Sequence, residues 1–253
     1  MIETVKRAYE VLDVRIAAIT MKEAVALCGD MAETNTPHLI FTANAEMLML
    51  ARRHEGLATC LAEADLVVAD GAGILWAGDV LGTPFPERVT GADLAKALLS
   101  TAAERGWPVY FLGGAPGVAQ KAAEHIASSH PGFQIAGTHD GFFDAAEEKK
   151  ILQSIREKET KILLVGMGVP KQEMWLLQHK EELGGVVAMG VGGVFDIMAG
   201  NLKRAPLWMQ KHRLEWAYRL WQQPSRIGRM TALPRYMMAV KKWKQERNRV
   251  PRA

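Results

Sequence analysis

Asp70 closes the apolar run DLVVAD at residues 65–70, and glycines follow it at positions 71 and 73. A carboxylate at the end of a buried strand can act as a general base, bind a ribose or cap the next helix. One pair of glycines is a weak nucleotide signal, because DGAG lacks the G-x-G-x-x-G spacing of dinucleotide-binding loops. The local pattern leaves all three roles for Asp70 open.

A second strand end carries Thr42 and Asn44, within FTANAEM at residues 41–47. Asn44 stands at a strand-to-helix junction, where an asparagine commonly caps the helix through its side-chain oxygen. In the alternative interpretation, both side chains face a ligand. The local sequence is equally compatible with a cap and with a ligand contact.

Arg88 lies close to a predicted helix start, and Asp196 follows a predicted strand and a glycine turn. Arg88 precedes a helix that Thr90 is expected to cap, with Asp93 completing a capping-box-like pattern. An arginine there suits a diphosphate clamp, although a lone arginine more often lies on the surface. Asp196 follows the turn GVGG at 190–193 inside an apolar segment, and a buried, paired carboxylate explains it as well as a catalytic one.

The most specific local arrangement is LLVGMGVPKQEMWL at residues 163–176. A buried strand leads into Gly166 and Gly168, which let a ligand approach the backbone closely. Pro170 suits the first position of a helix, and Lys171 and Gln172 then project from the first turn. Free amides, the helix dipole and a lysine together suit a phosphate or a sugar.

Alternating strand and helix patterns along residues 38–192 would position these side chains. Strands are predicted at 38–43, 65–70, 108–114, 133–138, 161–168 and 186–192, and helices at 45–53, 71–81, 91–106, 117–129, 144–159 and 171–183. Such alternation is typical of βαβ units, which build a parallel sheet with helices on both faces. We therefore expect a Rossmann-like, mostly parallel α/β fold that binds ligands beyond the carboxyl ends of its strands.

The pattern changes near residue 200, which predicts an α/β core at 1–200 and a helical appendage at 201–253. Prolines 206, 224 and 234 are expected to divide the appendage into short helices. Residues 201–253 hold 14 basic and 2 acidic residues, a balance of +12, whereas residues 1–200 hold 17 basic and 26 acidic ones. Such a basic segment indicates an anionic partner: a membrane surface, phosphates or nucleic acid.

The segment RLEWAYRLWQQPSRIGR at 213–229 bears on which partner this is. On a helix, Trp216 and Trp221 share one apolar arc and Arg219 lies opposite. This arrangement fits a core helix, an interfacial helix on anionic lipid, or stacking on single-stranded nucleic acid. No nucleic-acid-binding module accompanies it, so the lipid interpretation is favoured over nucleic acid.

The remaining features exclude several classes. No run reaches the roughly 18 apolar residues of a membrane span, and the N-terminus lacks the apolar core of a signal peptide. Cys28 and Cys60 form no ligand pattern and the seven histidines are scattered, so no metal is expected. The sequence therefore predicts a cytoplasmic protein with reduced thiols, attached at most to a membrane face.

Seven ordered blocks, spanning residues 42 to about 229, resemble the WecG/TagA/CpsF family of bacterial glycosyltransferases: TANAEM, ADGAGILWAG, RVTGADL, FLGGAPGVA, GFF, LLVGMGVPKQEMWL and GVGGVFDIMAGNLKRAPLWMQKHRLEWAYRL. The length resembles the TagA-like branch of wall teichoic acid synthesis. That branch implies inverting transfer of N-acetylmannosamine from UDP-N-acetylmannosamine to the 4-hydroxyl of N-acetylglucosamine on undecaprenyl diphosphate, giving a β-1,4 linkage. It also implies work at the inner membrane face without a metal or other cofactor.

The resemblance assigns roles to positions that match the family's motifs. It implies that Asp70 is the base and that Thr42, Asn44 and Gln172 also belong to the catalytic site. Arg88 matches the family's arginine before V-T-G. Three appendage arginines are implied to meet the diphosphate: Arg219, Arg226 and Arg229. Many relatives have proline in place of Ala43 or Ala45, a departure that leaves Thr42 and Asn44 unchanged.

Two alternatives remain at this point. The related WecG branch implies a mannosaminuronic acid donor, which differs from N-acetylmannosamine by one oxidation. An NAD-linked oxidoreductase shares the α/β core, although the missing G-x-G-x-x-G fingerprint counts against it. The sequence leaves open the donor sugar, the acceptor lipid and whether the chain forms a homo-oligomer.

Overall fold

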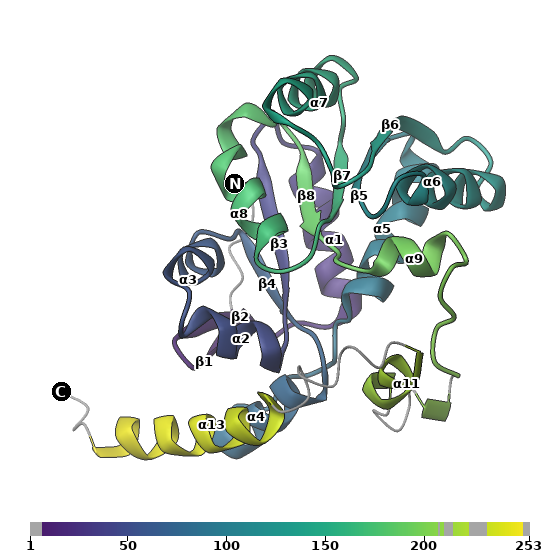
Figure 1. Ribbon diagram of the computed structural model, residues 1–253. Helices are drawn as coiled ribbons and strands as arrows, with labels where there is room; N and C mark the ends of the chain where they lie inside the picture. Colours follow the sequence, from purple (N-terminus) through teal and green to yellow (C-terminus); the bar gives the residue numbers. More distant parts are fainter. Residues whose placement is uncertain (1–6, 207, 210–214, 223–231, 250–253) are drawn as a thin grey trace.

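The computed structural model describes residues 7–206, 208–209, 215–222 and 232–249, and it contains one eight-stranded sheet between layers of helices (Figure 1). The strands lie in the order β1-β2-β4-β3-β8-β7-β5-β6; β1 and β2 pair antiparallel and the other neighbours pair in parallel. Their bounds are β1 Ala8–Val11, β2 Val14–Ala17, β3 His38–Ala43, β4 Leu66–Ala69, β5 Pro108–Gly113, β6 Gln134–His139, β7 Ile162–Gly166 and β8 Val187–Gly190. The expected mostly parallel α/β fold is confirmed.

Helices cover both faces of the sheet. Those that pack into one core are α2 Ala45–Ala51, α3 Glu55–Ala62, α4 Ala72–Leu81, α7 Ala145–Glu157, α8 Lys171–Gln178 and α13 Ala232–Arg249. Those that pack into the other are α1 Met21–Ala32, α5 Gly91–Arg105, α6 Val118–Ser129 and α9 Val194–Met198. On β3, Leu39 and Phe41 enter the first core and Ile40 the second. Burial on both faces explains why the strands read as continuous apolar runs.

The centre of the sheet contains a topological switch point. Strands β3 and β8 are neighbours, and their chains leave toward opposite faces, to α2 and to α9 respectively. In open α/β sheets, ligands bind beyond the carboxyl ends of the strands at such a point. The fold therefore directs attention to the turns that follow β3, β4, β7 and β8.

Two predicted helices differ from the structure. The helix expected over 171–183 ends at Gln178, and a 3₁₀ turn, η1 Lys180–Glu182, follows it. Pro170 is the residue before α8 rather than its first residue. The appendage also contains α11 Glu215–Gln222 and the 18-residue α13, so the expectation of short helices throughout was wrong. Pro234 lies in the first turn of α13, where a backbone N–H has no partner within the helix, and so it does not break the helix.

Helix α13 lies alongside α4 and packs on the α/β layer (Figure 1). Tyr236 and Val240 are buried there, and the Tyr236 hydroxyl donates to the Gly73 carbonyl oxygen over 3.3 Å. Lys244 Nζ donates to the Val80 carbonyl oxygen near the end of α4. This part of the appendage is thus attached to the core by buried apolar contacts, and the proposed boundary at residue 200 stays a prediction.

Candidate functional site

Strands β3 and β4 bring Thr42, Asn44 and Asp70 to one edge of the sheet. Thr42 pairs in register with Val68, and the Asp70 amide donates to the Ala43 carbonyl oxygen over 2.8 Å. The Asn44 side-chain oxygen accepts from the Met47 amide at 3.0 Å, which confirms Asn44 as the N-cap of α2. Its ligand-facing role stays a prediction. The two strand ends place these side chains beside the switch point.

The start of α5 completes this group. Asp70 Oδ2 accepts a hydrogen bond of 3.3 Å from the Gly91 amide, so the carboxylate meets the positive end of the α5 dipole. A Cβ at Gly91 would lie 3.2 Å from Thr42 Oγ1, so glycine lets the helix start come close to β3. Asp70 and Thr42 therefore approach the same turn of backbone from two neighbouring strands.

Arg88 lies close to this turn and forms an ion pair with Glu215 of α11. Arg88 Nη2 is 3.4 Å from Glu215 Oε2, and both side chains are largely buried. Glu215 Oε1 is also 3.4 Å from Arg204 Nε. Arg88, which the sequence predicted to clamp a diphosphate, is thus paired in this structure with a carboxylate of the appendage.

Arg204 links the appendage to α5. Its two terminal nitrogens contact Asp93 oxygens at 2.5 and 2.6 Å, a bidentate pair. Thr90 caps α5 by accepting from the Asp93 amide at 3.1 Å, as predicted, and its hydroxyl donates to the Asp93 carboxylate. The Arg204 guanidinium, more than the Thr90 hydroxyl, lowers the pKa of Asp93 against the opposing effect of burial. The sequence offered no signal for this pair, because 111 positions separate its members.

Gln172 joins the turns after β7 and β8. Its side-chain oxygen accepts from the Gly168 amide at 3.1 Å and from the Gly192 amide at 3.0 Å. Its amide nitrogen donates to Glu173 Oε1 at 2.7 Å, and only 3% of the residue is exposed. Gln172 therefore faces inward and holds two glycine turns together, rather than projecting from the first turn of α8.

The other predicted residues of this region have different partners. A Cβ at Gly166 would lie 2.8 Å from the Gly192 carbonyl oxygen, so the absence of a side chain here lets the turn after β8 approach the end of β7 closely. Lys171 Nζ donates to the Gly141 carbonyl oxygen at 2.9 Å and lies over the Phe143 ring. Asp196 is half-buried on α9, with Oδ1 3.5 Å from Asn201 Nδ2. Their roles in substrate binding stay predictions.

The structure describes little of the three appendage arginines that were predicted to meet the diphosphate. For Arg219 the structure describes the backbone of α11 alone, and Arg226 and Arg229 lie outside the described residues. On the same helix, Trp221 is 75% exposed and packs against Tyr218, with ring centroids 5.8 Å apart and the rings tilted by 41°. This exposure excludes the core-helix interpretation for Trp221.

Comparison with known proteins decides the family. The model of the glycosyl transferase WecG/TagA/CpsF family matches residues 9–250. The chain belongs to this family of glycosyltransferases. It is 33% identical over 210 residues to the N-acetylglucosaminyldiphosphoundecaprenol N-acetyl-beta-D-mannosaminyltransferase of Bacillus spizizenii, covering 83% of this chain and 81% of that protein. The protein of the same name from Staphylococcus aureus is 33% identical over 207 residues, covering 82% and 81%.

Family membership suggests a chemical role for the residues at the carboxyl ends of the strands. Asp70 and Thr42 at the start of α5, and the glycine turns joined by Gln172, lie on the same edge of the sheet as the switch point. An inverting glycosyltransferase uses a base for the acceptor hydroxyl, and transfer from a nucleoside-diphosphate sugar needs hydrogen-bond donors for the leaving diphosphate. The first group contains a carboxylate that could serve as such a base, whereas the Gly168 and Gly192 amides of the second group donate to Gln172.

Proposed function

We propose that this chain transfers N-acetylmannosamine from UDP-N-acetylmannosamine to the 4-hydroxyl of N-acetylglucosamine on undecaprenyl diphosphate, with inversion to a β-1,4 linkage. The observation that carries the proposal is the Asp70 carboxylate at the start of α5, beside Thr42 and next to the switch point. The names of the two relatives support the sugar and the acceptor. Cell-surface polymer synthesis of the wall teichoic acid type is the corresponding pathway.

In this mechanism Asp70 accepts the proton of the acceptor hydroxyl as its oxygen attacks the anomeric carbon. The bond from that carbon to the diphosphate breaks on the opposite face, and UDP leaves with the electron pair. Thr42 and Asn44 position the reacting sugar. Arg88, Lys171 and the turns containing Gly166 and Gly168 stabilise the charge on the departing diphosphate. We expect the reaction to need no metal or other cofactor.

Arg88 must exchange partners if it is to contact the diphosphate, because Glu215 now pairs with it at 3.4 Å. A diphosphate offers more negative charge than one carboxylate and accepts bidentate hydrogen bonds from arginine. The appendage that carries Glu215 also carries Arg219, Arg226 and Arg229, which we propose meet the lipid-linked diphosphate. The departing diphosphate of the donor would replace Glu215 as the partner of Arg88.

The test is turnover with a panel of UDP-sugars and a polyprenyl-diphosphate N-acetylglucosamine acceptor. We expect UDP-N-acetylmannosamine to be the preferred donor, with release of one UDP per disaccharide formed. A preference for the uronic acid donor would instead place the chain with the alternative activity of the same family. Binding of NAD but not UDP in a parallel titration would overturn the proposal in favour of an oxidoreductase.

A lipid acceptor requires the enzyme to work at a membrane surface, and we propose the inner face of the cell membrane. No helix among the described residues is long and apolar enough to cross a bilayer. Exposed apolar side chains occur in the appendage together with lysines: Trp208, Trp221, Leu233, Met238, Lys241 and Lys242. Apolar side chains beside basic ones are typical of interfacial segments on anionic lipid.

Replacing Lys241 and Lys242 with glutamate tests this attachment. Each basic residue near an anionic bilayer contributes about 1 kcal/mol, so we expect binding to phosphatidylglycerol vesicles to fall at least about tenfold. Turnover of a water-soluble acceptor analogue should stay near that of the unaltered chain. Unchanged vesicle binding by flotation would show that this face of α13 does not meet the lipid.

A further inference from the structure

Glu173 is a buried acid with an unusual environment beneath the two glycine turns. Its relative exposure is 0%, and among the described residues its Oε2 atom has no hydrogen-bond partner. Burial raises the pKa of this carboxyl, although hydrogen bonds from Gln172 and from its own backbone act in the opposite direction. Burying such a group without full pairing costs stability, so its presence calls for an explanation.

The surroundings of Glu173 supply no compensating cation in the described part of the chain. The nearby thiol of Cys60 is buried, and burial together with the Glu173 carboxylate raises the Cys60 pKa to about 11. The described ion pairs do not include Glu173. Its hydrogen bond with Gln172 Nε2, at 2.7 Å, is therefore the contact that needs to be understood.

That contact and two glycine amides together favour one orientation of the Gln172 amide. A glutamine side chain ends in an acceptor oxygen and a donor nitrogen of similar size, and it can be placed either way round. Gly168 and Gly192 both present N–H donors, so they require the oxygen between them. A reversed amide would set its NH₂ group against two N–H donors and lose both bonds. The Glu173 carboxyl, as the acceptor on the other side, selects the productive orientation.

The neighbouring strand is shaped around this pair. A Cβ at Gly190, the last residue of β8, would lie 2.8 Å from Gln172 Nε2 and 3.4 Å from Glu173 Oε1. A side chain at this position would force the Gln172 amide to move. The packing of β8 thus independently indicates that the Gln172–Glu173 pair occupies one defined arrangement.

We propose that Glu173 is a positioning residue: it orients the Gln172 amide, which holds the turns after β7 and β8 together for the donor diphosphate. The orienting role rests on the geometry alone, whereas the link to the donor rests on the proposed function. The role also explains why a buried, incompletely paired acid stands where an apolar residue would be more stable. Function here requires an acceptor on Gln172, at the expense of stability.

The test compares Glu173→Met with Glu173→Gln. Methionine has a similar length and no strong acceptor, whereas the glutamine oxygen can still accept from Gln172. We expect Glu173→Met to unfold at an equal or higher denaturant concentration, yet to speed hydrogen exchange of the Gly168 and Gly192 amides about tenfold, as the loss of one hydrogen bond allows. Its KM for the donor should rise by about the same factor, with a smaller change in kcat. Glu173→Gln should remain close to the original chain in exchange and in KM.

Glu148→Ala, a substitution on α7 that removes a contact of α8, is the control. It removes the acceptor of Trp175 Nε1, at 2.7 Å, from α8 without touching Gln172. Glycine exchange should stay unchanged in this variant, so an equal rise would show a general loosening of α8 and overturn the proposal. The proposal would also be overturned if Glu173→Met left the hydrogen exchange of the two glycine amides unchanged. The same holds if Glu173→Gln raised exchange and KM as much as Glu173→Met does. If the original chain fails to turn over UDP-N-acetylmannosamine, the proposed function fails, while amide exchange still decides the orienting role.

Discussion

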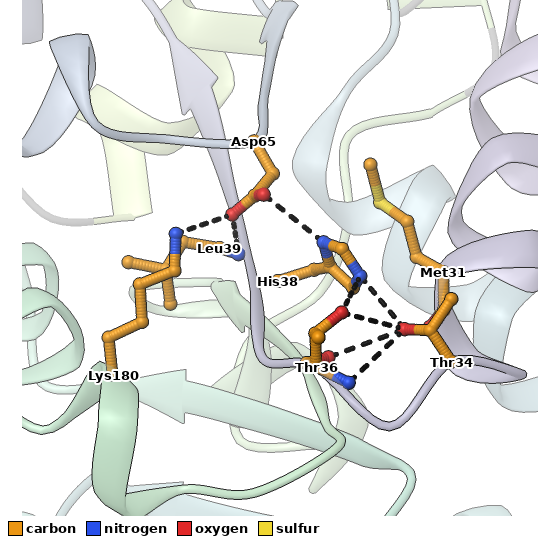
Figure 2. Close-up of polar contacts among 7 residues, drawn as sticks. All are labelled: Met31, Thr34, Thr36, His38, Leu39, Asp65 and Lys180. Atoms are coloured by element: carbon orange, nitrogen blue, oxygen red, sulfur yellow. Dashed lines mark hydrogen bonds and ion pairs between the residues drawn. The ribbon is translucent and has the colours of Figure 1, made fainter. Parts of the chain in front are cut away.

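Strand β4 has an aspartate just outside each end, and the two carboxylates have different surroundings. Asp65 precedes the strand and lies in a closed network with His38, Lys180 and the Leu39 amide, shown in Figure 2. Asp70 follows the strand and meets the Gly91 amide at the start of α5. The same residue type therefore has two different environments, because one strand end is closed by side chains and the other lies beside the switch point.

In the network at the amino end of β4, each polar side chain has a hydrogen-bond partner. Asp65 Oδ2 accepts from the Leu39 amide at 2.9 Å and from Lys180 Nζ at 3.0 Å, and its Oδ1 lies 3.1 Å from His38 Nδ1. The other ring nitrogen of His38 contacts the hydroxyls of Thr34 and Thr36, at 2.9 and 3.0 Å (Figure 2). Every one of these groups bonds another member of the network, so we assign it to stability.

The carboxyl-end groups also bond the backbone of loops. Asp70 and Gln172 accept from amides of Gly91, Gly168 and Gly192, and these amides belong to the turns where a ligand would bind. Side chains that shape loops determine what the loops can hold. We therefore propose that the position of a polar group relative to the switch point, more than its residue type, separates function from stability in this chain.

The largest expected effect is that of Asp70→Asn. Loss of the general base should lower kcat by about 10²–10⁴-fold, while the midpoint of unfolding and UDP binding stay nearly unchanged. Turnover assays with calorimetric UDP titration measure both properties. Near-normal turnover would remove Asp70 from the role of base and would break the contrast between the two aspartates.

Asp65→Asn should give the opposite result. Removing a charged acceptor from a partly buried network is expected to cost about 1–3 kcal/mol in the free energy of unfolding, with kcat unchanged. Burial opposes ionisation, but the bonds from Leu39, Lys180 and His38 outweigh it and lower the pKa of Asp65. A lowered pKa stabilises the fold above the unfolded value of about 3.9, and this contribution is lost as pH falls through the folded value. Urea unfolding at pH 7 and at pH 3 should show the difference between the two chains shrinking in acid.

Arg204→Ala tests whether the ion pairs of the appendage support the carboxyl end. Without Arg204, Asp93 loses its bidentate partner and Glu215 loses its contact with Arg204. Displacement of α11 should lower kcat/KM for the lipid acceptor about tenfold or more. Arg105→Ala is the control at the other end of α5, because the Arg105–Glu33 pair is half exposed on both sides and is worth less than about 1 kcal/mol. Equal kinetic losses in both variants would contradict a specific role for Arg204.

The smallest expected effects come from an isosteric pair of substitutions, Thr36→Val and Thr42→Val. At the amino end, loss of the Thr36 hydroxyl should reduce the free energy of unfolding by about 0.5–1.5 kcal/mol and leave kcat/KM unchanged. At the carboxyl end, Thr42→Val should lower kcat/KM several-fold with little change in unfolding. Denaturant unfolding and steady-state kinetics measure the free energy of unfolding and kcat/KM of each variant. A reversed pattern would refute the division between the amino and carboxyl ends of the strands.

Much of the architecture was predictable because its signals are local. Apolar runs and helical periodicity located the six strands and most helices from residue 38 to residue 192, although α3 Glu55–Ala62 was not predicted. The capping roles of Asn44 and Thr90 followed from residue type and position. The N-terminal strands β1 and β2 lacked such a signal, because each has only four residues and the hairpin between them is short. Pro234 suggested a break that its place in the first turn of α13 prevents.

The candidate site was predictable only in part. Strand-end position singled out Asp70 and Thr42, since parallel strands bring their carboxyl ends to one edge. The inward direction of Gln172 was not predictable, because two glycine turns and Glu173 together select it. The contacts of Arg204 with Asp93, and of Arg88 with Glu215, join residues 111 and 127 positions apart. No local pattern carries information across such separations.

The sequence by itself determined the class of fold, the edge of the sheet where chemistry is expected, and the family of the chain. These properties depend on periodicity and ordered motifs, which are written in neighbouring residues. Only the tertiary structure decided which polar groups bond one another: Asp65 with His38 and Lys180 at one end, and Gln172 with Glu173 and two glycine turns at the other. Hydrogen bonds depend on distances of about 3 Å between groups that packing alone brings together.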